Sequence, residues 1–411
     1  MRPRLPQALY ALRYRDFALY TAARFAATLA WQMLSVAAGW QIYALTHDPL
    51  ALGLAGLAQF LPFVTLVLPA GQVADVADRR FVLTGAYACE VLSAGLLCWL
   101  AWSNQPRIWA MYVAMALFGA GRAFWMPAGQ AITPRLVPPA AFPNAVAING
   151  TLFQTAAIGG PGVGGALYLL GPAVVYATTA SLLLLAMVLV LAIKPLAASP
   201  RAAWCISDTL EGLRFVLRQR VVLGAISLDL FAVLFGGTTA LLPIFAADVL
   251  QIGPLGLGIL RAAPGLGALT VAAVLAIYPL KRHVGSWLFG GVVVFGVATL
   301  VFGASHDIRL SLAALFCLGG GDMVSIYVRH LLVQLQTPDA IRGRVSAVNA
   351  IFIGSSNELG EFESGVTARC FGLVPAVLLG GVATLLVVVG ARHWFPELRT
   401  MDRFPAAVSG R

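Results

Sequence analysis

The stretch from Gly71 to Arg80, GQVADVADRR, separates two long apolar runs, Leu50 to Ala70 and Phe81 to Trp102. Each run is long enough to cross the roughly 30 Å of hydrocarbon in a bilayer. The charged stretch between them therefore predicts a short turn at one face of a membrane. The adjacent arginines Arg79 and Arg80 favour the cytoplasmic face, where short loops retain basic residues.

Composition extends this interpretation to the whole chain. Of the 411 residues, 60% are hydrophobic and only 11% are charged, unlike the composition of water-soluble globular proteins. About twelve apolar runs follow one another from Phe17 to Phe395, which predicts an all-α, multi-pass protein of the inner, cytoplasmic membrane. The basic residues fall mostly in alternate loops, so both termini are expected in the cytoplasm, and the net charge of +10 predicts no nucleic-acid partner.

The two halves of the chain repeat each other. A constant offset of 200 residues pairs identical residues in the two halves: Gly119 and Gly319, Gly121 and Gly321, Pro138 and Pro338, Asn149 and Asn349, Gly160 and Gly360, and Gly165 and Gly365. A parallel repeat of this kind predicts two pseudo-symmetric six-helix bundles, residues 1–193 and 221–411. The second bundle is expected to end in a short cytoplasmic tail.

A polar linker, residues 194–220, joins the predicted bundles. Asp208 is expected to cap a short amphipathic helix with Leu210, Leu213 and Leu217 on its apolar face. Such a helix would lie on the cytoplasmic leaflet. A solvated linker without a fixed position is the alternative.

The pattern Gly-x-x-x-Asp-x-x-x-Arg-Arg, which begins at Gly71, resembles the loop motif of the major facilitator superfamily. This chain departs from the family pattern in having Asp78 in place of a glycine. The resemblance implies the major facilitator fold. It also implies a conformational latch formed by Gly71, Asp75, Asp78, Arg79 and Arg80. Asp75 would be the acid that docks at the start of the eleventh span, with Arg79 and Arg80 as its charge partners. A plain anchor at the lipid headgroups is the alternative.

The fifth apolar run contains Gly-Pro-x-x-Gly-Gly, formed by Gly160, Pro161, Gly164 and Gly165. Pro161 is expected to bend the helix, and the glycines are expected to admit a neighbouring helix. The run resembles the exporter motif of the same superfamily, with Ala156 in place of its first glycine. The resemblance implies export, and it implies packing against the eighth span at three residues: Pro264, Gly265 and Gly267.

Four deep charges occupy mirrored positions in the repeat. Arg24 aligns with Asp229, and Arg122 aligns with Asp322, at depths where an isolated charge costs at least about 2.5 kcal/mol. We expect these side chains to face a shared polar cavity, in which Asp229 or Asp322 carries the coupling proton and an arginine is its charge partner. Permanent pairing within each bundle is the alternative. Glu90 is a further proton-coupling candidate.

Two other polar groups are candidates for the site. Glu358 and Glu361 share a face of the eleventh span, and either form a vestibule for protons or bond to neighbouring helices; for Glu363, bonding is favoured. Amide and aromatic side chains on the first two spans suit a large, partly apolar organic ligand. They are Gln32, Gln41, Gln59, Trp31, Trp40 and Phe60.

Other classes of protein find little support in the sequence. The five cysteines and five histidines are dispersed, and no Ser/His/Asp set or phosphate-binding loop is present, so neither an enzyme nor a cofactor or metal site is predicted. The chain is most similar to the superfamily branch of enterobactin and macrolide exporters. That resemblance implies a monomeric, proton-coupled exporter of a small organic compound. The alternatives are a facilitator or importer of a small metabolite, and a non-transporting sensor or scaffold.

Overall fold

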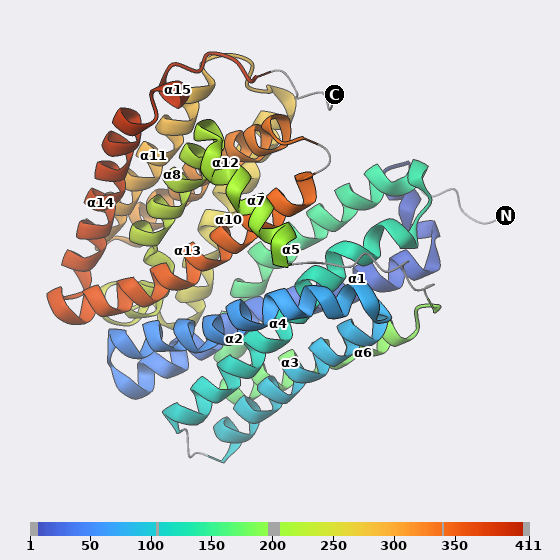
Figure 1. The fold of residues 1–411 in the computed structure, drawn as a ribbon. Coiled ribbons are helices and arrows are strands. Elements are labelled where there is room, and N and C mark those ends of the chain that lie inside the picture. Colours follow the sequence, from blue (N-terminus) through green and yellow to red (C-terminus); the bar gives the residue numbers. More distant parts are fainter. Residues whose placement is uncertain (1–6, 104–106, 196–205, 339–340, 406–411) are drawn as a thin grey trace. The chain divides into compact units, whose positions relative to one another are not determined.

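A computed structural model of the chain describes residues 7–103, 107–195, 206–338 and 341–405. All regular structure in these ranges is helical (Figure 1). The longer helices are α1 (Arg15–Thr46), α2 (Pro49–Val76), α3 (Arg79–Trp102), α4 (Ile108–Leu136), α5 (Phe142–Tyr168), α6 (Pro172–Leu191), α7 (Ile206–Arg218), α8 (Arg220–Gly236), α10 (Gly253–Ile277), α11 (Val284–Ala304), α12 (Ile308–Gln336), α13 (Arg342–Phe371) and α14 (Leu373–Trp394). Short helical turns, η3 (Thr238–Leu241), α9 (Leu242–Ile244) and η4 (Phe245–Val249), prolong α8.

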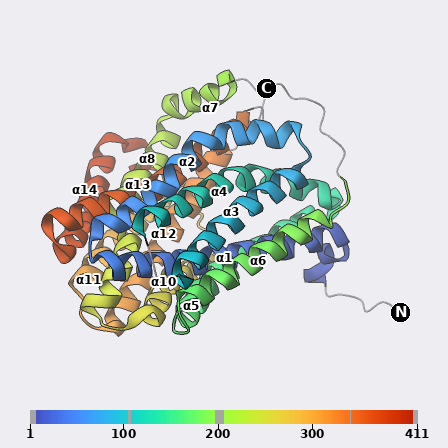
Figure 2. The ribbon, with the colours of Figure 1, turned by 90° about the horizontal axis from the view of Figure 1, so that it is seen from below.

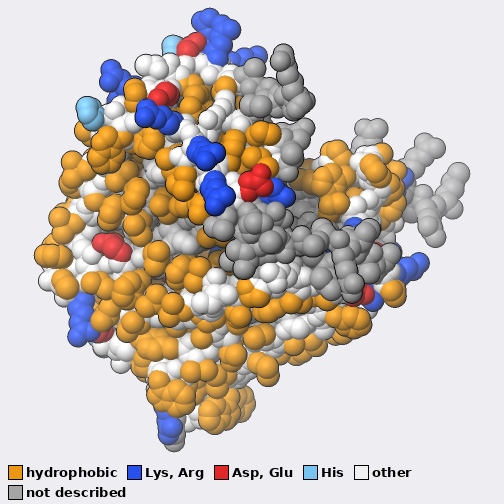
Figure 3. Space-filling model, viewed as in Figure 1, with side chains coloured by type: hydrophobic (Ala, Val, Ile, Leu, Met, Phe, Trp, Pro, Cys, Tyr) orange, Lys and Arg blue, Asp and Glu red, His pale blue; other side chains and the backbone are white. Residues whose placement is uncertain are grey.

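The predicted all-helical membrane fold is confirmed. Nine helical stretches within the described ranges are long and apolar enough to cross a membrane. Three more helices, α1, α5 and α13, have 32, 27 and 30 residues, a sufficient length, but they carry more polar side chains. Hydrophobic side chains cover most of the face seen in Figure 3. A total of twelve spans remains a prediction.

The chain divides into two compact units. The first comprises Met1–His47, Leu57–Ala203 and Ile252–Ala262, and the second comprises Asp48–Gly56, Trp204–Gln251 and Ala263–Arg411. The units therefore differ from the predicted bundles in two short segments, the start of α2 and the start of α10.

Each unit is held together by long helix–helix contacts. In the first unit, α1 packs on α5 and α6, and α3 lies beside α4 and α6 (Figures 1 and 2). In the second unit, α11 packs on α12 and α14, and α8 packs on α13 and α14. These packed helices position the buried charges described below.

The charged stretch between α2 and α3 is mostly helical, so the predicted turn at Gly71 to Arg80 is wrong in its extent. Helix α2 continues through Gly71 and Asp75 to Val76, and only Ala77 and Asp78 separate it from α3. Nothing in residues 71–76 breaks a helix. The side chain of Asp75 lies outside the described residues, and its role as a latch stays a prediction.

Asp78 ends one helix and begins the next. Its backbone is extended, with φ −62° and ψ 115°, and its carboxylate accepts a hydrogen bond from the Arg80 backbone N–H at 3.0 Å. The Arg80 guanidinium pairs with the same carboxylate at 2.7 Å and donates to the Ile193 carbonyl at 2.7 Å. Asp78 thus caps α3 at the position where the family pattern has glycine.

We expect Asp78→Ala to destabilise the protein by about 0.5–2 kcal/mol through loss of this cap. The side-chain hydrogen bond from Arg80 lowers the pKa of Asp78. The carboxylate therefore stabilises the fold above the pKa of an unfolded aspartate, and this stabilisation is lost as the pH falls through the lowered pKa. Thermal unfolding at pH 7 and at acid pH should show the difference between wild type and Asp78→Ala narrowing on acidification. A difference independent of pH would contradict the ionised cap.

Helix α7 is present in the linker, and its buried face matches the predicted one at Leu213, which packs against the cluster around Val216, but not at Leu217. Val216 is fully buried among residues of α8, α12 and α13, and Gly212 lies against the backbone of Arg344. Leu217, which was predicted to be on the apolar face, is 56% exposed. Asp208 lies inside the helix instead of at its cap, because the helix begins at Ile206.

Candidate functional site

A buried ion pair joins α8 and α12 in the second unit. Arg329 Nη1 lies 3.0 Å from Asp229 Oδ2, and the two residues are only 2% and 4% exposed. Ser325 Oγ donates a hydrogen bond to Asp229 Oδ1 at 3.3 Å. Because water is excluded from both charged groups, each depends on the other to offset the cost of its burial.

Helix geometry brings Asp322 into the same cluster. Asp322, Ser325 and Arg329 are spaced three and four residues apart, and so lie along one face of α12. Asp322 interacts electrostatically with both Asp229 and Arg329. Arg329 Nη1 also donates to Asn349 Oδ1 of α13 at 3.4 Å. We call these five residues the acid–arginine cluster.

Sequence reasoning missed Arg329, the largest fully buried side chain among the described residues. An offset of 200 residues places Gly129 opposite Arg329, so the mirrored charges of the repeat do not include it. The sequence does contain a signal for Arg329, because an arginine inside an apolar run that spans the membrane marks a functional site.

Asp229 has a partner that the sequence analysis does not predict. Arg24 and Arg122 belong to the first unit, whereas Asp229 and Asp322 belong to the second. Within its own unit Asp229 is paired with Arg329. For Asp229 the structure therefore matches the alternative, pairing inside one bundle.

Glu90 is the buried acid of the first unit. It lies on α3 and is 1% exposed, and within the described part of the chain no hydrogen-bond partner reaches its Oε1. Trp125 hydrogen-bonds its carboxyl group, and Arg122 interacts with it electrostatically. Seven residues line a small cavity here: Arg24, Ala27, Thr28, Trp31, Tyr87, Glu90 and Trp125. The cavity thus brings Glu90 and Arg24 to one place.

Both deep arginines of the first unit lie over aromatic rings. The Arg122 guanidinium lies 5.1 Å from the centre of the Trp31 ring and 5.0 Å from that of Phe63. The Arg24 guanidinium lies 5.9 Å from the centre of the Phe153 ring. Cation–π attraction at desolvated sites offsets part of the cost of burying these charges.

Several residues predicted to line a substrate cavity instead pack inside the first unit. Gln41 is 8% exposed and accepts a 2.6 Å hydrogen bond from Tyr176, and Phe60 is 7% exposed in an apolar cluster. Gln32 donates to the Ala157 carbonyl at 3.3 Å. In this structure neighbouring side chains cover Gln41 and Phe60, and their part in a substrate cavity stays a prediction. Two other members are half-buried and stay predictions: Trp40 and Gln59.

The acids of α13 have different surroundings. Glu358 is buried, with 8% exposure, and a Cβ at Gly56 of α2 would come within 2.9 Å of Glu361 Oε2. Glu363 Oε1 accepts a 2.7 Å hydrogen bond from Thr367 of the same helix. This bond lies within α13 and is not the predicted one to Arg369 or a neighbouring helix, so that role of Glu363 stays a prediction, as does the vestibule role of Glu358 and Glu361.

The glycines of α5 serve close packing. Cβ atoms added at Gly160 and Gly164 would come within 2.5 Å of Gln32 and 2.8 Å of Met33, both on α1. At Gly165 an added Cβ would come within 2.5 Å of the Pro254 carbonyl oxygen at the start of α10.

Within the first unit, a different residue of α10 meets α5, and the predicted contacts of Pro264, Gly265 and Gly267 with α5 stay predictions. Gly258 lies against Pro161 in the first half of α10, whereas Pro264 and Gly267 pack on α12. The first turns of α10 belong to the same unit as α5, and the rest of the helix belongs to the other unit.

In the described ranges no group of three or more His, Cys, Asp or Glu residues is placed to hold a metal ion. The four cysteines that the structure describes are free thiols.

Comparison with known families identifies the class. The family described as transmembrane secretion effector, a branch of the major facilitator superfamily, matches residues 7–409. The chain belongs to this family of membrane transporters. It is 26% identical to the enterobactin exporter EntS of Shigella dysenteriae serotype 1 over 387 residues, 90% of this chain and 91% of that protein. It is 27% identical over the same length to EntS of Escherichia coli strain HS, with the same coverage.

Solved structures share the fold at low identity. A POT family transporter in complex with 5-aminolevulinic acid superposes with a TM-score of 0.75 and 11% identity, over 93% of this chain and 96% of that one. The nucleoside transporter NupG superposes with a TM-score of 0.72 and 13% identity, over 92% of this chain and 99% of that one. A D-xylose–proton symporter superposes with a TM-score of 0.73 and 13% identity, over 94% of this chain and 99% of that one. These similarities show the transporter fold.

Proposed function

We propose that this chain is a secondary active transporter that exports a small organic compound, drug-like or siderophore-like, in exchange for protons. The acid–arginine cluster carries the proposal, because it buries the titratable carboxylate of Asp229 and holds a second, half-buried one, Asp322, on helices apolar enough to span a membrane. Buried ionisable residues in spans mark proton and substrate pathways. The exporter names of the relatives support the outward direction.

In this mechanism Arg329 is the charge that competes with the proton. While Asp229 is ionised, the guanidinium 3.0 Å away offsets its burial. A conformational step that moves Arg329 away leaves a buried carboxylate, which takes up a proton to lose its charge. Asp322 shares the proton with Asp229, since two nearby carboxylates resist being ionised together.

Glu90 is the corresponding acid of the first unit, with Arg24 and Arg122 as its nearby cations. The remaining features of the proposal follow from the resemblance and the distribution of charge. The chain works as a monomer in the inner membrane with both termini in the cytoplasm. It alternates access between two six-helix bundles and uses Asp75 as the latch.

The proposal predicts that the carboxylates are required for coupling. Purified protein is reconstituted in liposomes that trap a pH-sensitive dye at acid pH, and enterobactin is added outside, with erythromycin as a second probe. Wild type should accumulate one of these compounds while the lumen becomes more alkaline, because each inward cargo step exports protons. In Asp229→Asn and Asp322→Asn the cargo-dependent alkalinisation should disappear.

Asp307→Asn is the matched control, since Asp307 caps α12 through backbone N–H groups at 2.8 and 3.0 Å, and asparagine caps equally well. Its coupling should equal that of wild type. Cargo flux without any change in luminal pH would favour a facilitator. Unchanged alkalinisation in both carboxylate variants would exclude them as proton carriers.

A further inference from the structure

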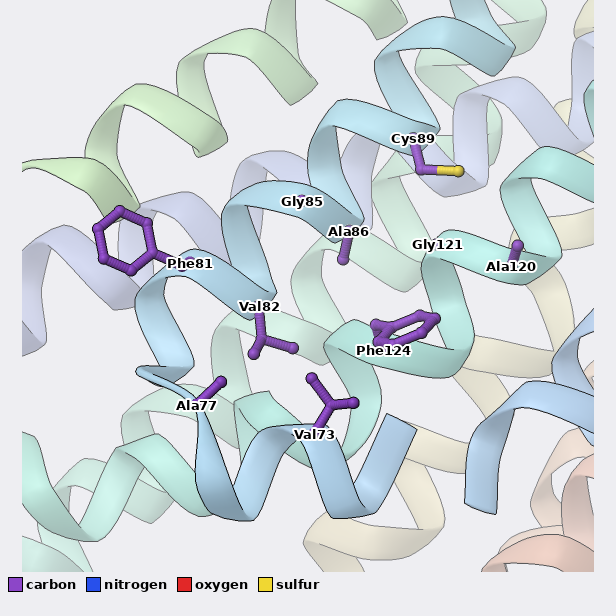
Figure 4. Close-up of a pocket in the computed structure, with 10 residues that line it drawn as sticks. All are labelled: Val73, Ala77, Phe81, Val82, Gly85, Ala86, Cys89, Ala120, Gly121 and Phe124. Atoms are coloured by element: carbon purple, nitrogen blue, oxygen red, sulfur yellow. The ribbon is translucent and has the colours of Figure 1, made fainter. Parts of the chain in front are cut away.

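In the first unit, the start of α3 is fastened to the end of α6, the helix beside it. Asp78 caps α3, and Arg80, the second residue of α3, donates to the carbonyl of Ile193, two residues beyond α6. Figure 4 shows this place beside an apolar pocket, with Ala77 in the turn before α3 and Phe81 in its first turn. Two charged side chains at the start of α3 thus hold the two helix ends together.

The second unit has a different arrangement at the corresponding place. By their order in the chain, α11 and α14 are the counterparts of α3 and α6 in the repeat, and they also pack along each other. His283 precedes α11 without a side-chain cap, and the second residue of α11 is Gly285, where α3 has Arg80. The first backbone N–H groups of α11 have no partner within the helix, so they need acceptors from outside it.

Residues that follow α14 supply these acceptors. The N–H groups of Gly285 and Val284 donate to the carbonyls of Met401 and Asp402 at 2.9 and 3.3 Å, and the His283 N–H donates to Asp402 Oδ1 at 3.1 Å. The Asp402 carboxylate also lies at the positive end of the α11 dipole. We call residues 396–405 the strap, because they bind the start of α11 after α14 has ended.

The strap is seated by close packing on two helices. Leu398 is fully buried in an apolar cluster with residues of α8 and α11, and Met401 packs against this cluster. A Cβ at Gly285 would collide with the Leu398 carbonyl oxygen, and a Cβ at Gly224 of α8 would come within 2.6 Å of Leu398 Cδ1. The two glycines therefore make the room that the strap occupies.

We propose that the strap is a detachable clamp, whose release lets the start of α11 open while the rest of the second unit stays folded. Only Leu398 is buried among residues 396–405, and residues 400–405 form no helix, so the strap leaves without unwinding a long helix. Segments with few buried contacts open at a lower free energy than the core. In the first unit, Asp78 and Arg80 belong to the start of α3 itself and cannot leave it. The order at the start of α11, unlike that of α3, therefore depends on a separate segment.

Hydrogen–deuterium exchange of the full-length protein in nanodiscs, measured by mass spectrometry, tests the clamp. Gly285→Ala should expel the strap, because the added methyl group meets the strap backbone. Exchange should then quicken several-fold in peptides that cover residues 283–285 and 398–402, although alanine favours a helix more than glycine does. Peptides from the middle of α11 and from the start of α3 should exchange as in wild type.

Gly290→Ala is the matched control. Gly290 lies on the same helix, and an added Cβ there meets nothing within 4 Å, so this variant should exchange as slowly as wild type at residues 283–285. A chain that stops after Phe395 lacks the strap and should exchange as fast there as Gly285→Ala. Adding Gly285→Ala to the shortened chain should bring no further increase, because the three atoms nearest to the added Cβ all belong to the strap.

The full-length Gly285→Ala protein and its control decide the question even if the shortened chain does not fold. Exchange at residues 283–285 that stays at the wild-type rate in Gly285→Ala would overturn the clamp. Faster exchange spread over α8, α12 and α14 would also overturn it, because the strap would then be an ordinary part of the core and its loss would unfold the unit.

Discussion

Arg329→Leu should destabilise the protein by about 3–5 kcal/mol, because it leaves Asp229 buried without its counter-charge. Asp229 is 4% exposed, so water does not replace the guanidinium. Ser325 Oγ donates one long hydrogen bond, 3.3 Å, to Oδ1, and a neutral hydroxyl does not replace the lost positive charge. Thermal unfolding of the purified protein in detergent measures the loss.

An exposed ion pair in the same unit is the matched control for Arg329→Leu. Arg220 pairs with Glu397 at 3.4 Å, and their side chains are 75% and 41% exposed. Such a pair contributes about 0–1 kcal/mol, so Arg220→Leu should change stability little.

The double variant Arg329→Leu with Asp229→Leu separates the unpaired charge from lost packing. Removing both charges should restore much of the stability that the single change costs. If Arg329→Leu costs no more than Arg220→Leu, the buried pair is not a main stabilising contact of the second unit.

Gly164→Leu should destabilise the first unit by about 1–3 kcal/mol, because α5 has no room there for a side chain. An added Cβ would come within 2.8 Å of Met33 Cα, which is backbone and cannot rotate away. The two helices would have to separate, which weakens the α1–α5 contact. Leucine has a higher helix propensity than glycine, by nearly 1 kcal/mol, so the clash has to exceed that gain.

Gly162→Leu controls for propensity on the same helix. A Cβ at Gly162 meets nothing within 4 Å, so this variant gains propensity without a clash and should unfold at the wild-type temperature or higher. Thermal unfolding of both variants under one condition gives the comparison. Equal unfolding temperatures would contradict the close packing of Gly164 on α1.

Much of the fold could be predicted from local composition. Long apolar runs specify membrane-spanning helices whatever surrounds them, because a backbone in hydrocarbon has to satisfy its own hydrogen bonds. The glycine motif of residues 160–165 indicated close packing, and each of its buried glycines does lie against a neighbouring helix. The pattern at residues 71–80 identified the superfamily, and the family match over residues 7–409 confirms it.

The partners of the buried charges could not be predicted in the same way. The repeat indicated which charges lie deep, but a constant offset compares equivalent places in two bundles and gives no distances inside either one. Arg329 was missed because its mirrored position holds a glycine. The bond between Gln41 and Tyr176 joins residues 135 positions apart, so no local pattern in the sequence predicts it.

The sequence by itself determined the helical membrane fold, the internal repeat and the transporter family, since each depends on residues near one another in the chain or on a repeated order. Only the tertiary structure decided that Asp229 meets Arg329, that Asp78 caps α3 and holds Arg80, and that Glu90 is enclosed with Arg24. These contacts depend on the rotation and depth of each helix in its unit. A shift of one residue along a helix turns a side chain by about 100°, which hydropathy cannot resolve.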